Sequence, residues 1–179
     1  MTNVKAKGLL AAFLLTLTLA GCGGQDKLPS SNDVSGATTP PTEEQSIVVK
    51  RTISVYSTDS ELSKTSAREV EIELSDGDDE LALVKSALSE LQKDGGAEEI
   101  SLWKAISFDK VSLEDGLATV DILLPDEARL GGPGEILAIE SLTKTMFQFD
   151  FVDAVDILVD GEALETLMGH VELEHPYRK

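Results

Sequence analysis

The feature that most constrains the fold is a change of hydrophobic period along residues 47–159, where apolar residues recur first every second residue and then at helical spacing. Residues 67–74 read AREVEIEL, and here apolar and acidic side chains alternate: Val70, Ile72 and Leu74 against Glu69, Glu71 and Glu73. This alternation is typical of a half-exposed antiparallel strand. Residues 76–96 follow with an acidic start, apolar residues at helical spacing and two closing glycines, which predicts a helix.

The other segments of the folded part extend this pattern. A β-branched and aromatic run at 47–56 predicts a strand before the alternating one. Residues 106–113 and 118–124 flank an Asp115-Gly116 turn and predict a hairpin. A Gly-rich start at 131–134 leads into a second helix to Phe147, and residues 155–159 predict a last strand. We therefore expect an α+β fold, with two helices packed on one face of a mostly antiparallel sheet.

The first 21 residues have the layout of a secretory signal peptide, with Lys5 and Lys7 before an uncharged apolar stretch. That stretch, residues 8–20, is shorter than the roughly 20 apolar residues a membrane-spanning helix needs. Ala20, Gly21 and Cys22 follow, and this order resembles the lipobox of bacterial lipoproteins. The resemblance implies cleavage between Gly21 and Cys22, lipid such as palmitate on the Cys22 thiol, and a place on the extracytoplasmic face of the cell membrane. The alternative is a secreted protein with one spare thiol.

Charge and composition limit the partners. The chain has 33 acidic and 15 basic residues and a net charge of −18, which opposes binding to nucleic acid and to anionic lipid surfaces. Contact with the membrane should therefore come through the lipid anchor alone. Residues 22–46 are polar and rich in Gly, Ser, Thr and Pro, which predicts a disordered, acylated linker. We expect a signal peptide at 1–21, this linker at 22–46 and one domain at 47–179.

A motif near the C-terminus resembles a known family. Residues 155–173 read VDILVDGEALETLMGHVEL, and the residues that carry the resemblance, after Val159, are Asp160, Gly161, Glu165, Thr166, Leu167, Gly169 and His170. Together with the hairpin at 111–124 and the helix after Gly131, they resemble the GerMN domain, named from a lipoprotein of sporulation and spore germination. The resemblance spans residues 53–176. It implies a fold similar to ring-building modules, a non-enzymatic role in the cell envelope, and no cofactor or catalytic residue; the motif residues are structural or binding residues.

Three features of the sequence could bind an ion, but a structural role is favoured for each. The glycines at 131–134 could bind an anion, but no P-loop pattern surrounds them, so a turn into the helix is favoured. His170 and His175 could bind a metal with Glu172 or Glu174, but two histidines are a thin ligand set for zinc. We therefore expect no metal, and we expect His170 to be a turn residue. The acidic run at 76–80 lacks EF-hand spacing and is more typical of helix capping.

These observations favour a protein-binding or scaffold module over an enzyme. No G-x-S-x-G element occurs, and no motif ties either histidine to a serine. The expected partner is an envelope protein or another copy in a homo- or hetero-oligomer, with a basic surface opposite Glu69, Glu71 and Glu73. The alternative is a protein that binds peptidoglycan or accompanies cell-wall hydrolysis. Only three side chains could stack on sugars: Trp103, Tyr56 and Tyr177. Of these, Trp103 lies in a predicted strand and should pack in the core.

Overall fold

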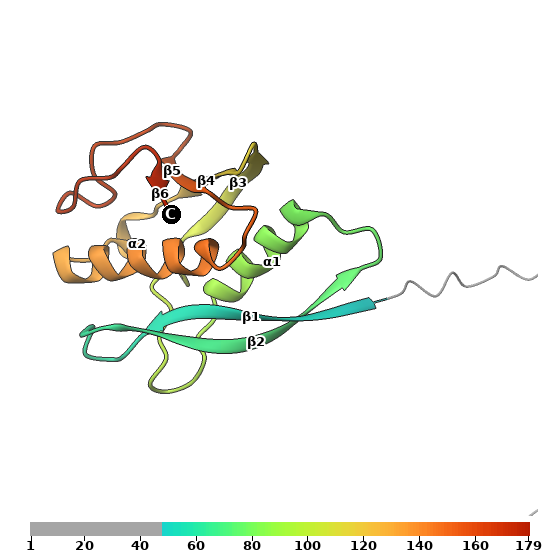
Figure 1. Cartoon of the computed structure of the whole chain (residues 1–179). Coiled ribbons are helices and arrows are strands. Elements are labelled where there is room, and N and C mark those ends of the chain that lie inside the picture. The colour runs from blue at the N-terminus through green and yellow to red at the C-terminus, as the bar shows by residue number, and fades with distance from the viewer. Residues whose placement is uncertain (1–47) are drawn as a thin grey trace, which may run out of the picture. The chain divides into compact units, whose positions relative to one another are not determined.

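The structure is a computed structural model that describes residues 48–179 (Figure 1). Its elements follow the predicted order: β1 (Val48–Thr58), β2 (Thr65–Ser75), α1 (Glu80–Leu91), β3 (Ser107–Glu114), β4 (Leu117–Leu123), the 3-10 helix η1 (Asp126–Ala128), α2 (Gly132–Phe147), β5 (Ala154–Val159) and β6 (Tyr177–Arg178). The α+β class is therefore confirmed. The predicted signal peptide at 1–21 with Gly21, the lipidation site Cys22 and the linker at 22–46 lie outside the described residues.

The strands form two sheets instead of the single sheet that the sequence predicts. β1 and β2 pair antiparallel along their whole length, and β3, β4, β5 and β6 form a separate sheet in that order. Within the second sheet β4 and β5 are parallel, because α2 carries the chain across between them. Both helices contact strands of both sheets, and Figure 1 shows them between the sheets. The expectation that they cover one face of one sheet is thus corrected.

The two-sided packing of the helices explains which residues form the core. Ile53, Val55, Ile72 and Leu74 point inward from the two-stranded sheet, and the alternation predicted for residues 67–74 is confirmed. From the second sheet, Val120, Ile122, Val155 and Ile157 are fully buried. Apolar residues on both helices fill the space between, among them Val84, Leu88, Leu142 and Met146. Among the described residues no helix has both the length and the apolar character to cross a membrane.

Local signals place the turns and helix starts as predicted. Asp115 and Gly116 both have positive φ, 49° and 81°, as a two-residue hairpin turn between right-twisted strands requires. The Asp79 carboxylate accepts a hydrogen bond of 2.9 Å from the Ala82 N–H and caps α1. The Asp78 carboxylate accepts one of 2.6 Å from the Ser75 N–H. Of the acidic run, Asp79 therefore caps the helix, and Asp78 holds the turn that precedes it.

Two expectations about single side chains need correction. Trp103 is fully buried, as expected, but it lies in a turn before β3 and not in a strand. Its indole N–H is 3.0 Å from the Ala138 carbonyl oxygen, so α2 supplies the hydrogen bond that a buried indole needs. Ile136 is one of the apolar residues at helical spacing that predict the second helix, yet its exposed fraction is 53%. The neighbouring Glu135 is fully buried in its place.

Candidate functional site

The motif after β5 begins with a turn that is held against β4. Asp160 and Gly161 have φ of 52° and 80°, and the Asp160 N–H donates to the Ile122 carbonyl oxygen at 3.0 Å. The Gly161 N–H donates at 2.7 Å to the carboxylate of Asp121, which is 6% exposed. A buried carboxylate therefore fixes the turn on the neighbouring strand.

The next motif residues form a closed loop. The carbonyl oxygen of Glu165 accepts a hydrogen bond of 2.8 Å from the Leu173 N–H, and Thr166 pairs with Glu172 in an isolated antiparallel bridge. The Leu167 side chain is 1% exposed and lies in the core. Backbone and apolar contacts thus occupy this part of the motif.

Glu135 of α2 holds the end of the motif. Its buried carboxylate accepts hydrogen bonds from the Met168 N–H at 2.7 Å and the His170 N–H at 3.1 Å. The His170 Nδ1 also lies 3.0 Å from the same carboxylate, while half of the His170 side chain is exposed. Gly169 between them has a φ of 103°, which bends the chain so that both N–H groups reach the carboxylate. His170 is accordingly in a bend, and no strand face joins it to Glu172.

The second histidine has different partners. His175 Nδ1 lies 2.6 Å from a carboxylate oxygen of Asp156, and its Nε2 lies 2.8 Å from the Leu164 carbonyl oxygen. These acceptors favour the protonated ring and raise the pKa of His175 above its ordinary value, the Leu164 carbonyl having the larger effect and Asp156 the next. The structure does not bring His170 and His175 together, and residues 48–179 contain no group of three metal-ligating side chains.

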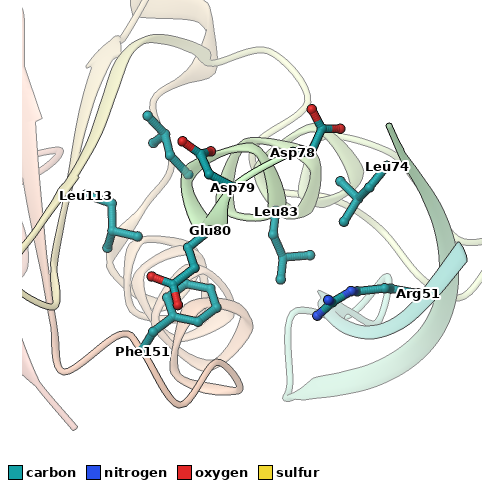
Figure 2. Close-up of a pocket in the computed structure, with 9 residues that line it drawn as sticks. Arg51, Leu74, Asp78, Asp79, Glu80, Leu83, Leu113 and Phe151 are labelled. Atoms are coloured by element: carbon teal, nitrogen blue, oxygen red, sulfur yellow. The ribbon is translucent and has the colours of Figure 1, made fainter. Parts of the chain in front are cut away.

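A groove of about 570 Å³ opens beside α1 (Figure 2), and no residue of the motif lines it. Leu74 and Arg51 come from the two-stranded sheet, Leu83 from α1 and Phe151 from the segment between α2 and β5. A shallower hollow of about 330 Å³ continues from it and shares Arg51, Leu83 and Phe151. The groove thus lies where all the layers of the fold meet, and its floor is apolar.

Charged groups line the rim of this groove. Asp78, Asp79 and Glu80 at the start of α1 lie on one side, and Asp150 lines the continuation. Arg51 is the cation among the lining residues, and Figure 2 shows its side chain reaching from β1 toward Leu83. Within residues 48–179 no carboxylate oxygen lies within 4.0 Å of its guanidinium group. The groove therefore combines apolar surface with an excess of negative charge.

Sequence reasoning did not identify this groove, although one signal was present. Arg51 is two residues before Ile53 in β1, so alternation places a charged side chain on the face that otherwise packs in the core. Glu135 carries the same signal in α2, because Ile139 and Leu142 follow it on the buried face at spacings of four and seven. In both cases the charged residue on an apolar face has a specific role: Arg51 lines the groove, and Glu135 accepts hydrogen bonds from the motif.

The acidic strand face is as exposed as predicted but is not uniformly negative. Glu69, Glu71 and Glu73 of β2 are exposed. Lys50 of β1 lies among them, 2.5 Å from a Glu71 oxygen and 3.7 Å from a Glu73 oxygen. This cation reduces the charge that the face presents to a partner.

Comparison with known proteins gives one family match. A family model named Germane and described as "Sporulation and spore germination" matches residues 54–165, more than half of the chain. Of the motif residues, Asp160, Gly161 and Glu165 lie inside the match, whereas the residues from Thr166 to His170 lie beyond its end. No curated protein sequence matches the chain.

Solved structures from Bacillus subtilis and Clostridium perfringens are among those that match the chain. The first GerMN domain of the sporulation protein GerM from Bacillus subtilis is 19% identical, with a TM-score of 0.50; the match covers 72% of this chain and 98% of that one. The tandem GerMN domains of the same protein are 15% identical with a TM-score of 0.50, over 80% of this chain. The match spans only 49% of the tandem, about half its length. A candidate lipoprotein from Clostridium perfringens is 18% identical with a TM-score of 0.49, over 74% of this chain and 88% of that one.

Proposed function

The chain belongs to the Germane family of sporulation and spore germination domains, and from this we propose that it is a non-enzymatic, protein-binding module of the cell envelope. One observation carries the proposal: a groove lined by apolar side chains, an acidic rim and Arg51 lies beside an edge of residues 48–52 in β1, and within residues 48–179 neither the Arg51 guanidinium group nor this edge has a partner. Such a surface offers apolar area, charge and backbone hydrogen-bonding groups in one place, which is what recognition of an extended polypeptide requires.

We further propose that the module is anchored through lipid on Cys22 and acts outside the cytoplasm. The lipobox-like order of Ala20, Gly21 and Cys22 supports this proposal. Two or more acyl chains give stable attachment where one is marginal. In this arrangement the polar residues 22–46 would act as a tether, and the domain would search for its partner within the length of that tether.

Photo-crosslinking in living cells tests the binding role. A photoreactive amino acid replaces Phe151 in the groove of the full chain, and in a control strain it replaces Glu127, which is exposed and does not line the groove. The proposal predicts a discrete protein crosslink from position 151 that is absent from position 127. Equal crosslinking from both positions, or none from either, would contradict a specific protein-binding groove.

The alternative role at the cell wall is separated by two parallel assays on the full chain in detergent. Purified sacculi are pelleted with the protein, and soluble muropeptides are measured with and without added metal ions. A binding module for proteins should remain in the supernatant and release no muropeptides. Strong cosedimentation without any protein crosslink would assign the chain to peptidoglycan instead, and reproducible cleavage lost on changing one acidic residue would make it an enzyme.

A further inference from the structure

β1 pairs with β2 along one edge. Along its other edge, the backbone groups of the second half of the strand have hydrogen-bond partners, and those of the first half have none within residues 48–179. In the second half, the Ser54 N–H donates to the Gln148 side-chain oxygen at 2.8 Å, and the Gln148 amide donates to the Ser54 carbonyl oxygen at 2.7 Å. The Tyr56 N–H donates to Thr145 Oγ1 at 3.1 Å, and Thr58 exchanges two backbone hydrogen bonds with Ile100. The side chains of Thr145 in α2 and Gln148 at its C-cap, together with one backbone bridge, thus substitute for a neighbouring strand.

Ser54, Tyr56 and Thr58 use their backbone groups on the edge away from β2, and every second residue of a strand faces the same neighbour. The backbone groups of Val48, Lys50 and Thr52 therefore face this edge too. Within residues 48–179 these groups have no hydrogen-bond partner on this side. Val48 and Val49 are 50% and 41% exposed, so apolar side chains flank the open edge. An unpaired strand edge with exposed apolar residues is a template for another strand.

The open edge runs directly into the groove. Arg51, Thr52 and Ile53 line its continuation together with Phe149 and Phe151. A strand added to the edge would direct every second side chain toward Leu83 and Phe151, on the face that Arg51 shares with the core. Those side chains would meet an apolar floor and four carboxylates against one cation: Asp78, Asp79, Glu80 and Asp150 against Arg51.

We propose that residues 48–52 of β1 accept an extended segment of a partner protein as an additional strand, and that the side chains this segment directs into the groove are apolar and basic. The inference rests on the proposed protein-binding function and specifies its mode and the chemistry of its partner. Main-chain hydrogen bonds supply the attraction in such strand addition, and the groove selects alternate side chains. The net charge of −18 draws a basic segment toward the molecule.

A second copy of the chain fits this edge poorly in the registers centred on its two cations, Lys50 and Arg51. A two-fold antiparallel pairing centred on Lys50 or Arg51 would place that cation directly opposite its own equivalent, and like charges opposite each other destabilise a strand pair. Two bodies that each carry a charge of −18 also repel. A different protein with a basic segment is therefore the occupant we infer.

Synthetic peptides test the inference with the ¹⁵N-labelled full-length protein in detergent micelles. The probe is acetyl-Thr-Val-Thr-Lys-Thr-Val-Thr-amide, whose Val and Lys side chains share one face, and the control replaces its Lys by Glu. The expected result is that the Lys probe shifts the amide signals of Lys50, Thr52 and Phe151 and binds at least about tenfold more tightly than the Glu probe, about 1.4 kcal/mol. Equal binding of the two peptides would overturn the charge selection.

Backbone methylation separates strand addition from simple charge attraction. Only alternate amides of an added strand face β1, so N-methyl groups on one alternate set of the Lys probe should abolish binding, while methyl groups on the other set should leave it nearly unchanged. Equal tolerance of both sets, or equal loss from both, would overturn the strand pairing.

Two protein variants locate the contact. Thr52→Pro removes an outward N–H without touching the hydrogen bonds to β2, and edge strands tolerate proline there. It should weaken the Lys probe about threefold to tenfold relative to Thr52→Val, which keeps the N–H. The double variant Glu80→Gln, Asp150→Asn removes two rim charges whose side chains have no hydrogen bond within residues 48–179. This variant should bind the Lys probe and the Glu probe with more similar affinities than the wild type does. An unchanged ratio of the two affinities would place the peptide outside the groove.

Failure of this inference is distinguishable from failure of the proposed function. If position 151 crosslinks a protein in cells but neither peptide shifts the β1 signals, the groove binds its partner without strand addition. Dimerisation of the full chain that Thr52→Pro abolishes would show that a second copy occupies the edge, which would also overturn the inference.

Discussion

At the scale of single residues, buried carboxylates determine where the C-terminal segment lies. Asp121 in β4 accepts the Gly161 N–H, and Glu135 in α2 accepts the N–H groups of Met168 and His170. Both residues are buried, Asp121 with 6% of its surface exposed and Glu135 with none, so each carboxylate needs these donors to offset its desolvation. The segment after β5 has little regular structure, and its N–H groups donate to these two carboxylates instead of to the carbonyl groups of a neighbouring strand.

Replacement of Glu135 by Gln tests this role. The Gln amide has one oxygen, and its NH₂ group would face an N–H donor of the loop, so a buried donor would lose its acceptor. The expected loss is about 1–3 kcal/mol of the free energy of unfolding. Urea denaturation measures it, with Glu127→Gln on the exposed 3-10 helix as the matched control. Equal midpoints for the two variants would show that the carboxylate is not needed.

The raised pKa of His175 gives a pH dependence. The folded state holds the proton more tightly than the unfolded chain, because the Leu164 carbonyl and the Asp156 carboxylate accept from the ring. The stabilisation is therefore fully present below the unfolded pKa of about 6.5 and is lost as the pH rises through the higher folded value. His175→Asn should lower the urea midpoint more at pH 5.5 than at pH 9. A loss that is constant with pH would contradict a charged His175.

At the scale of elements, the Asp160-Gly161 turn joins β5 to the motif. A Cβ at Gly161 would have open space, its nearest neighbour being an Asp121 oxygen at 3.9 Å, so the constraint is the φ of 80° and not a clash. Gly161→Val should cost about 1–3 kcal/mol of unfolding free energy, because branched side chains disfavour this conformation. Gly96→Val is the control, since Gly96 has no positive φ and no atom near its Cβ position. A variant at position 161 that melts like the wild type while losing a partner would identify the turn as a binding site.

Elements whose signals are local could be predicted from the sequence, and their arrangement could not. Alternation in residues 67–74, the capping acids before α1 and the Asp115-Gly116 turn all depend on neighbours in the chain, and all are confirmed. The division into two sheets depends on which strands meet across α2, and a period of two gives only the face that is buried. The apolar neighbours of Trp103 predict a strand, whereas Trp103 lies in a turn and its indole N–H donates a hydrogen bond to α2.

The candidate groove could not be predicted for the same reason. Its lining comes from β1, β2, α1, β3 and the segment after α2, which are brought together only by the packing of the layers. The motif that carried the family resemblance is instead engaged in structural contacts, with Leu167 in the core and His170 bonded to Glu135. Only the charges at Arg51 and Glu135 on otherwise apolar faces signalled these environments in the sequence.

At the scale of the whole molecule, the net charge limits which surfaces the chain can approach. Removal of residues 1–21 would remove Lys5 and Lys7 and no acid, so the net charge of −18 would become −20. A body of that charge is repelled by anionic lipid headgroups, and its own surface would not hold it at a membrane. Stable attachment would therefore depend on the acyl chains proposed for Cys22.

Replacement of Cys22 by Ala tests the attachment directly. Without the thiol no diacylglycerol can be linked, and the net negative charge of the remaining chain opposes contact with anionic lipid once the signal is cleaved. We expect the Cys22→Ala protein to move from the membrane fraction to the soluble extracytoplasmic fraction, or to persist as an unprocessed precursor of higher mass. Ser30→Ala, in the same polar segment, should fractionate like the wild type. If neither the membrane fractionation nor the intact mass changes in Cys22→Ala, lipid anchoring is refuted. The alternative would then be the secreted form with a free thiol, and globomycin should have no effect on the processing of that form.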